Sequence, residues 1–168
     1  MRLSIEKFFD ATVCALVRLV KTGNRLIDEE LWYNHANLQK TIPRKISTLN
    51  EDQKSVFTHF LRKSSKMANL GTVQNPTYAV LDGENVFALT GKGGSGKTYL
   101  YDCILGHIRK NRRIALAVAS TGIAAALFPG GRTGHFRFKI PRYDLGSHST
   151  CKIPVDSNLA KLIQRAEV

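Results

Sequence analysis

Residues 91–98 have the composition and spacing of a loop that holds phosphate groups. Their sequence, GKGGSGKT, matches G-x-x-x-x-G-K-[ST] at every fixed position. Glycines in such a loop allow backbone N–H groups to turn inward around a triphosphate, and the following helix directs its positive end toward the same place. In this arrangement Lys97 reaches the β- and γ-phosphates, and the Thr98 hydroxyl binds Mg²⁺. The segment therefore predicts a site for ATP or GTP with Mg²⁺.

The elements expected around this loop agree with a nucleotide site. An apolar run over residues 86–90 predicts a strand before the loop, and helical periodicity predicts a helix over residues 97–110. Residues 114–119 are continuously apolar, which after a helix is typical of a strand buried on both faces of a parallel sheet. A short helix is expected over residues 121–128, ended by Pro129. This succession of strands and helices predicts an α/β fold.

The chain ahead of the loop is expected to be mostly helical. Apolar periodicity predicts helices over residues 4–20, 25–39 and 50–63. Residues 40–48 contain Pro43 and are interpreted as a linker.

A polar stretch separates the third helix from the phosphate loop. Residues 64–76 are predicted to be a loop, and residues 78–90 to form a strand, a turn at Asp82-Gly83 and a second strand.

Composition limits the classes of protein to which the chain can belong. Its 168 residues suffice for one domain, and 43% hydrophobic with 23% charged residues exclude a wholly disordered chain and a coiled coil. The net charge is +12, and residues 86–143 carry ten lysines and arginines against one acid, Asp102. We therefore expect a polyanionic partner at the middle of the chain.

Targeting and cysteine signals predict an intracellular protein. The three cysteines, Cys14, Cys103 and Cys151, form no CxxC pair, which disfavours a zinc site or a disulfide framework. No apolar run approaches the ~18 residues that a membrane span requires. Glu6, Lys7 and Asp10 interrupt the stretch where a signal peptide would be apolar, so no membrane partner is expected.

Four blocks in the same order resemble the petite-integration-frequency (Pif-type) family of superfamily-one DNA helicases. They are LNEDQ at residues 49–53, the phosphate loop at 91–98, ASTGIAA at 119–125 and GGRTGHFRFKIP at 130–141. The copies carried by Helitron transposons are the most similar, and the resemblance covers roughly residues 24–168. It implies a P-loop NTPase fold with a RecA-like parallel sheet, preceded by a helical N-terminal segment.

The resemblance also implies domain limits and an activity. Residues 1–48 are expected to be the helical N-terminal segment and linker, and residues 49–168 the N-terminal part of a helicase motor domain, truncated before the Asp-Glu metal motif. The implied enzyme is an ATP-dependent 5′-to-3′ DNA helicase that uses ATP and Mg²⁺ on single-stranded DNA as a monomer. The chain alone is expected not to unwind DNA. A nuclear location is expected, and a mitochondrial one is the alternative. The biological pathway that the enzyme serves stays open between telomere maintenance, repair, recombination and transposition.

The resemblance assigns roles to individual residues. Gln53 would hydrogen-bond the adenine edge, and its spacing from Asn50 is also that of a capping box, so both roles can hold. The predicted catalytic residues are Lys97 and Thr98, with Thr98 also the metal ligand. The predicted nucleotide-binding residues are Gln53, Gly91, Gly93, Gly94, Ser95, Gly96, Lys97, Thr98 and Tyr99. The predicted DNA-binding residues are Thr121, Gly122, Thr133, His135 and Arg137.

The last block departs from the family pattern at two positions. Phe136 stands where the family has a small hydroxyl residue, and Gly134 stands where it has a small apolar one. Phe136 and Phe138 flank Arg137, and aromatic faces interleaved with bases suit a single strand. The same alternation, continued to Ile140, is equally that of the buried side of a strand.

Two other functions fit part of the pattern. Lys92 within the loop is also found in partition-type and ion-pump-type ATPases, where this lysine reaches across a dimer, although the long segment before the loop is untypical of them. The other alternative is a basic, non-catalytic module that binds single strands and keeps only a remnant of the nucleotide pocket. Its DNA affinity would fall steeply with salt and would not respond to ATP.

Overall fold

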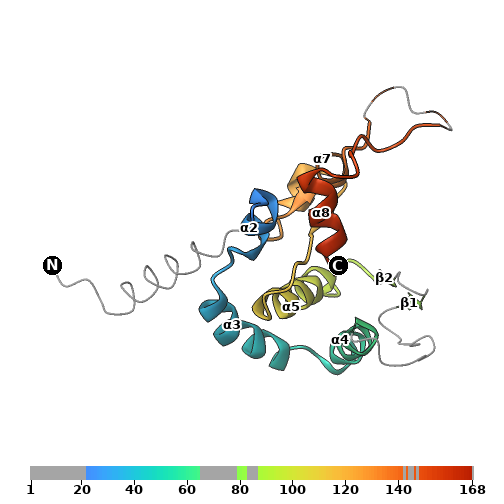
Figure 1. Ribbon diagram of the computed structural model, residues 1–168. Coiled ribbons are helices and arrows are strands. Elements are labelled where there is room, and N and C mark those ends of the chain that lie inside the picture. The colour runs from blue at the N-terminus through green and yellow to red at the C-terminus, as the bar shows by residue number, and fades with distance from the viewer. Residues whose placement is uncertain are drawn as a thin grey trace, which may run out of the picture.

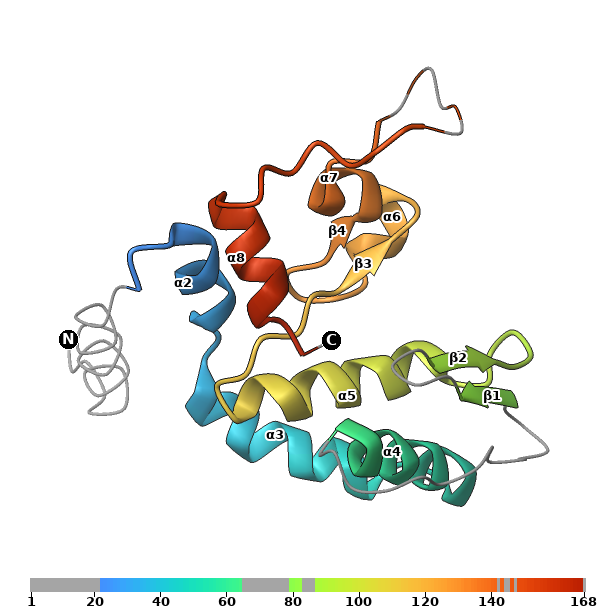
Figure 2. The same cartoon turned by 45° about the vertical axis from the view of Figure 1, so that its right-hand side comes forward.

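Helix α5 (Lys97–Lys110) lies at the centre of the structure, with helices on one side and a small parallel sheet on the other (Figure 2). The structure is a computed structural model that describes residues 22–64, 79–82, 87–141, 143, 146 and 148–167. The other elements in chain order (Figure 1) are α2 (Arg25–Leu31), α3 (His35–Ser47), α4 (Glu51–Ser64), β1 (Ala79–Asp82), β2 (Phe87–Thr90), β3 (Val118–Ala119), α6 (Gly122–Ala125), β4 (Arg132–Thr133), α7 (Gly134–Phe138) and α8 (Asn158–Arg165).

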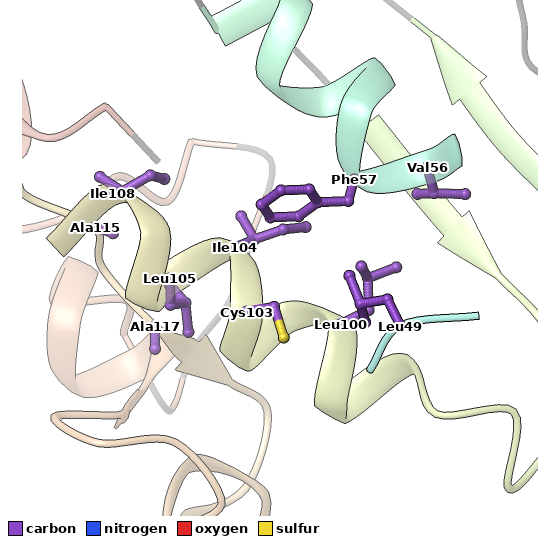
Figure 3. Packing of buried hydrophobic residues seen from close by; sticks show 10 residues of the cluster. All are labelled: Leu49, Val56, Phe57, Leu100, Cys103, Ile104, Leu105, Ile108, Ala115 and Ala117. Atoms are coloured by element: carbon purple, nitrogen blue, oxygen red, sulfur yellow. The ribbon is translucent and has the colours of Figure 1, made fainter. Parts of the chain in front are cut away.

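The main apolar cluster surrounds α5. Val56 and Phe57 of α4 pack toward Leu100 and Ile104 of α5, and the same cluster includes Cys103 (Figure 3). Leu100 and Cys103 are completely buried. Burying a leucine side chain stabilises the fold by about 1.5–3 kcal/mol, so this helix contributes much of the core. The predicted helix over residues 97–110 is confirmed.

The apolar run after α5 is buried on both faces, as its composition predicts. Ala115 and Ala117 pack into the cluster around α5. Ile114 and Leu116 pack into a second cluster on the other side, with side chains from α2 and α8. This alternation has the period of two of an extended chain. Regular pairing is shorter than expected, however, because only Val118–Ala119 forms a strand, β3.

Two pairs of strands are present in the described residues. Strands β1 and β2 are antiparallel, with Ala79 opposite Thr90, which confirms the predicted pair of strands. Of the turn predicted at Asp82-Gly83, Asp82 belongs to β1 and Gly83 lies outside the described residues. Strands β3 and β4 are parallel, with Val118 opposite Arg132. An isolated parallel bridge joins Ile114 to Ala166. The small parallel sheet agrees with the expected α/β class without establishing a complete RecA-like sheet.

The N-terminal segment differs from expectation. Residues 25–39 were expected to form one helix, but α2 ends at Leu31 and α3 begins at His35. The break follows from Asn34, whose side-chain oxygen accepts a hydrogen bond from the Asn37 N–H at 2.9 Å and so starts a new helix. An asparagine side chain that bonds to a nearby backbone N–H favours the start of a new helix over continuation of the preceding one.

The prediction of a linker over residues 40–48 is wrong, because α3 runs through Pro43 to Ser47. A proline inside a helix costs about 3 kcal/mol through its missing N–H and its ring. Tertiary contacts offset this cost. Ile42 is buried against Gly106 of α5, and Lys45 Nζ donates to Asp102 Oδ2 at 2.6 Å.

Four further elements follow β3, namely α6, β4, α7 and α8. Helix α6 spans only Gly122–Ala125 of the expected residues 121–128, and turns complete the rest. The strand interpretation of Phe136, Phe138 and Ile140 is wrong, because Gly134–Phe138 is the helix α7. Thr133 starts this helix by accepting a hydrogen bond from the Phe136 N–H at 3.3 Å.

Helix α8 was not anticipated from the sequence. Ser157 caps it through the Ala160 N–H at 3.1 Å, and Leu162 is completely buried. After α8, Ala166 forms the parallel bridge to Ile114, and the Glu167 N–H donates a hydrogen bond to the Ile114 carbonyl at 3.0 Å.

Packing crosses the expected boundary at residue 48. Helix α3 packs along α5, and α2 packs against α8, where the Asn24 side chain donates to the Asn158 carbonyl at 2.8 Å. The expected helix over residues 4–20 lies outside the described residues, as does the loop expected after residue 64. In the part of the chain that the structure describes, no helix is long and apolar enough to cross a membrane.

Candidate functional site

The phosphate loop connects β2 to α5 in a conformation that needs glycine. Gly94 and Gly96 have φ of 76° and 84°, in the left-handed region that other residues rarely adopt. A Cβ added at Gly93 or Gly94 would meet nothing within 4 Å, so the loop borders open space there. The Gly96 N–H and the first turn of α5 lie at the positive end of a helix that continues to Lys110. This arrangement suits a polyphosphate.

The Lys97 ammonium lies inside the curve of the loop. Lys97 Nζ donates to the carbonyls of Gly91 at 2.7 Å and Lys92 at 2.8 Å, and contacts Ser95 Oγ at 3.4 Å. These partners are neutral dipoles, and phosphate oxygens are stronger acceptors for an ammonium. Phosphate oxygens could therefore replace these carbonyls as the acceptors of the Lys97 ammonium.

Thr98 lies in the first turn of α5 and is exposed. A hydroxyl in this position is a suitable ligand for Mg²⁺, which usually keeps several waters and takes phosphate oxygens from its substrate. Among the described residues, no group of three or more His, Cys, Asp or Glu side chains could hold a metal ion. The Thr98 hydroxyl fits a metal that is also held by the phosphates of a nucleotide, and Thr98 is the side chain that would hold it.

Gln53 connects the start of α4 to the phosphate loop. Its Oε1 accepts from the Asn50 N–H at 3.1 Å, and its own N–H donates to Asn50 Oδ1 at 2.8 Å, which is the predicted capping box. Its Nε2 donates to the Ser95 carbonyl at 3.3 Å. The contact is close, because a Cβ on Gly96 would lie 2.5 Å from this nitrogen. The side chain is thus at the loop, where a nucleotide would lie.

Tyr99 is attached to the end of α3. Its hydroxyl lies 2.8 Å from Thr48 Oγ1 and donates to the Lys45 carbonyl at 3.3 Å. Tyr99 thus follows the phosphate loop directly in the sequence, while its hydroxyl is hydrogen-bonded at the end of α3.

Four of the predicted DNA-binding residues lie where the parallel strands end. Thr121 follows β3 and caps α6 through the Ala124 N–H at 3.2 Å, and Thr133 ends β4 and caps α7. Ala119 of β3 lies opposite Thr133 of β4, so both strands direct their carboxyl ends to the same edge. Ligands in open α/β sheets bind at this edge. Gly122 begins α6 and is exposed, and His135 of α7 is also exposed.

Arg137 is placed differently from these four. Its Nη2 donates to Glu30 Oε1 at 2.6 Å, and the two side chains are 8% and 9% exposed. A buried guanidinium that is paired with a carboxylate does not reach a ligand at the surface. The structure therefore does not bring Arg137 to the surface with Thr133 and His135.

A second buried arginine extends this network. Arg109 donates to the Pro129 carbonyl at 2.8 Å and to the Ala115 carbonyl at 2.9 Å, and its guanidinium lies 4.2 Å from the centre of the Tyr33 ring. Burial lowers the pKa of Arg109 and raises the pKa of Tyr33. Nothing in the sequence pattern pairs these residues, because Tyr33 lies between α2 and α3, Arg109 lies on α5, and Pro129 lies in the loop after α6.

Comparison with known proteins identifies the family of the chain. The family model described as PIF1-like helicase matches residues 48–168, which is most of the chain and includes the phosphate loop, β3, β4 and α7. No curated protein matches the chain.

Proposed function

Because the chain belongs to the PIF1-like helicase family, we propose that it contributes the nucleotide-binding part of an ATP-dependent motor that moves 5′ to 3′ on single-stranded DNA. The observation that carries this proposal is the preformed phosphate loop, with left-handed Gly94 and Gly96 and with Lys97 enclosed by the carbonyls of Gly91 and Lys92. A similarity to Helitron-type copies and a nuclear location remain part of the same proposal.

In the proposed mechanism the loop binds the nucleotide by exchange of partners. Lys97 moves its hydrogen bonds from loop carbonyls to the β- and γ-phosphates, and backbone N–H groups near the start of α5 donate to phosphate oxygens. The Thr98 hydroxyl holds Mg²⁺, which when bound neutralises charge that develops on the phosphates. Gln53 has an amide with unused capacity, since its two donors and one acceptor allow an adenine contact beside the capping box.

Coupling to DNA runs through α5. The loop begins this helix, and Leu105 and Ile108 of the helix share a cluster with Ala115 and Ala117, immediately before β3. Thr121 lies directly after β3. A nucleotide that shifts the start of α5 therefore acts on the segment that carries the proposed DNA contacts, and we expect ATP to change DNA affinity.

Nucleotide binding tests the site with a matched pair of lysines. Lys97→Ala removes the enclosed ammonium, while Lys92→Ala removes an exposed lysine of the same loop and leaves its carbonyl in place. We expect a fluorescent ATP analogue with Mg²⁺ to bind the native chain and Lys92→Ala, and to lose measurable affinity for Lys97→Ala. Equal affinity in all three proteins would refute the site.

DNA binding tests the coupling and separates the alternatives. Affinity for single-stranded DNA is measured with and without a non-hydrolysable ATP analogue. A change on adding nucleotide supports the helicase proposal, and a salt-sensitive affinity indifferent to nucleotide supports a non-catalytic binding module. A nucleotide-dependent dimer that Lys92→Ala disrupts would instead support the partition-type ATPase.

A further inference from the structure

Helix α7 presents an aromatic ring to solvent between two cations. Phe136 is 53% exposed. The guanidinium carbon of Arg132 lies 5.5 Å from the centre of its ring, and Lys139 Nζ lies 4.8 Å from it. Arg132 belongs to β4 and Lys139 ends α7, so the two cations approach from both ends of the helix.

The surrounding structure determines which aromatic side chain faces outward. Successive residues of a helix are rotated by about 100°, so Phe136 and Arg137 lie on different faces of α7. Arg137 is anchored inside by Glu30 of α2. Thr133 sets the start of the helix through the Phe136 N–H. Arg137 is directed inward, and Phe136 lies on another face of the helix, exposed to solvent.

We propose that Phe136, with Arg132 and Lys139, is a stacking site for one base of single-stranded DNA, in which the ring receives the base and the two cations receive the flanking phosphates. This inference rests on the proposed function, because it assumes that the chain binds single-stranded DNA. It gives a location and two partner cations to Phe136, which the sequence pattern left open between a single-strand contact and the buried side of a strand, and which is not among the four candidate contacts at the strand ends.

Charge and shape together select this ligand. An exposed ring surrounded by cations is a poor surface for an apolar partner, since covering it would desolvate Arg132 and Lys139. A nucleotide supplies both complementary groups, a flat base for the ring and phosphates for the cations. Base stacking on an aromatic side chain is stronger than the contact of an exposed cation with the same ring, so the base can displace the cations toward the phosphates.

The main comparison uses two probes and four proteins, and a fifth protein, Arg132→Gln, tests the phosphate contacts. The probes are an oligothymidylate of about 16 nucleotides and a matching abasic deoxyribose-phosphate chain, which keeps the phosphates and lacks the bases. The proteins are the native chain, Phe136→Ala, Phe136→Tyr and Tyr143→Ala, the last removing an exposed aromatic residue outside α7. Binding of the fluorescent ATP analogue by each protein shows that the nucleotide site is intact.

We expect the native chain and Phe136→Tyr to prefer the oligothymidylate over the abasic chain. Phe136→Ala should lose roughly 5- to 100-fold of its affinity for the oligothymidylate and bind both probes alike. Tyr143→Ala should behave as the native chain. The dependence of affinity on salt should be unchanged in Phe136→Ala, because the phosphate contacts persist, and should weaken in Arg132→Gln.

The opposite results separate the two levels of the proposal. If the native chain prefers the oligothymidylate and Phe136→Ala keeps that preference, the stacking site is wrong while DNA binding stands. If the native chain binds both probes equally, base stacking is absent from this surface and the inference is likewise overturned. If it binds neither probe, the proposed DNA function fails together with the inference.

Discussion

Arg137 Nη2 lies 2.6 Å from Glu30 Oε1, and this contact joins residues 107 positions apart in the chain. Both side chains are nearly inaccessible to water. The pair connects α2, which lies ahead of the matched family region, to α7, which carries the proposed stacking residue. The orientation of a surface helix thus depends on a carboxylate in the N-terminal segment.

Breaking this ion pair should destabilise the protein strongly. Glu30→Gln leaves the buried Arg137 charge without its counter-charge, and loss of one partner of a buried pair costs about 3–5 kcal/mol. Urea unfolding measures this change. The double variant Glu30→Leu with Arg137→Met should recover much of the loss, because no charge then remains buried. A single variant as stable as the native chain would contradict the arrangement.

Substitutions at Gln53 and Asn50 should distinguish the capping of α4 from the contact between Gln53 and the phosphate loop. Gln53→Glu keeps an oxygen for the Asn50 N–H but replaces the donor to the Ser95 carbonyl with an acceptor. We expect the unfolding free energy to fall by about 1–3 kcal/mol, because a carboxylate oxygen then faces the Ser95 carbonyl at a buried position, and we expect a clear loss of affinity for the ATP analogue. Asn50→Ala, which removes the other half of the capping box, is the control and should lower stability by about 1 kcal/mol while leaving nucleotide affinity nearly unchanged.

Gly96→Ala should impair the phosphate loop for two independent reasons. The position has φ of 84°, where alanine is strained by about 1–2 kcal/mol, and the added Cβ would lie 2.5 Å from Gln53 Nε2. Gly93→Ala is the matched control, because its Cβ meets nothing within 4 Å. Calorimetric titration with ATP and Mg²⁺ should show a much larger loss for Gly96→Ala, and equal losses would contradict the described loop.

The contact between α3 and α5 should be sensitive to one methyl group. A Cβ on Gly106 would lie 2.2 Å from Ile42 Cδ1, and Ile42 is 2% exposed. Alanine gains about 1 kcal/mol in helix propensity, whereas overpacking a filled core costs about 1–3 kcal/mol. We therefore expect net destabilisation of Gly106→Ala, relieved by the second substitution Ile42→Val. Thermal unfolding measures both, and a Gly106→Ala variant more stable than the native chain would show that Ile42 moves aside freely.

His107 should make stability depend on pH. Burial, and then the charges of Lys110 and Arg113, lower the pKa of His107 below its usual value. The unfolded chain then binds a proton more readily than the folded one, so the contribution is present above about pH 6.5 and is lost as the pH falls through the folded pKa. When the pH is lowered from about 8 to about 5, the thermal unfolding midpoint should fall less in His107→Gln than in the native chain. Parallel curves for the two proteins would disprove the assignment.

The phosphate loop and its surroundings could be predicted because local signals determine them. Left-handed backbone at Gly94 and Gly96 requires glycine, and the apolar positions of α5 repeat with the helical period. The capping box of Asn50 and Gln53 is likewise a contact between residues three apart. In each case the interaction that determines the local structure joins residues only a few positions apart in the sequence.

The features that were missed depend on distant partners. Pro43 predicts a break by itself, but Ile42 and Lys45 hold the helix against α5. Arg137 lies in a basic segment typical of a DNA contact, and only the fold reveals that Glu30 neutralises it. The positions of Thr121, Thr133 and His135 agree with a strand-binding edge, and their contacts with DNA stay predictions.

The placement of α2 bears on how this chain can be divided. Ile27 and Glu30 lie in the interior beside Leu162 and Arg137, although the matched family region begins only at residue 48. A protein cut at that boundary would expose the apolar surface of Leu162 and leave the Arg137 guanidinium without its counter-charge. A synthetic peptide of residues 22–47 carries Ile27 and Glu30, the two partners that the cut protein lacks. The two pieces, made separately, should therefore assemble by fragment complementation.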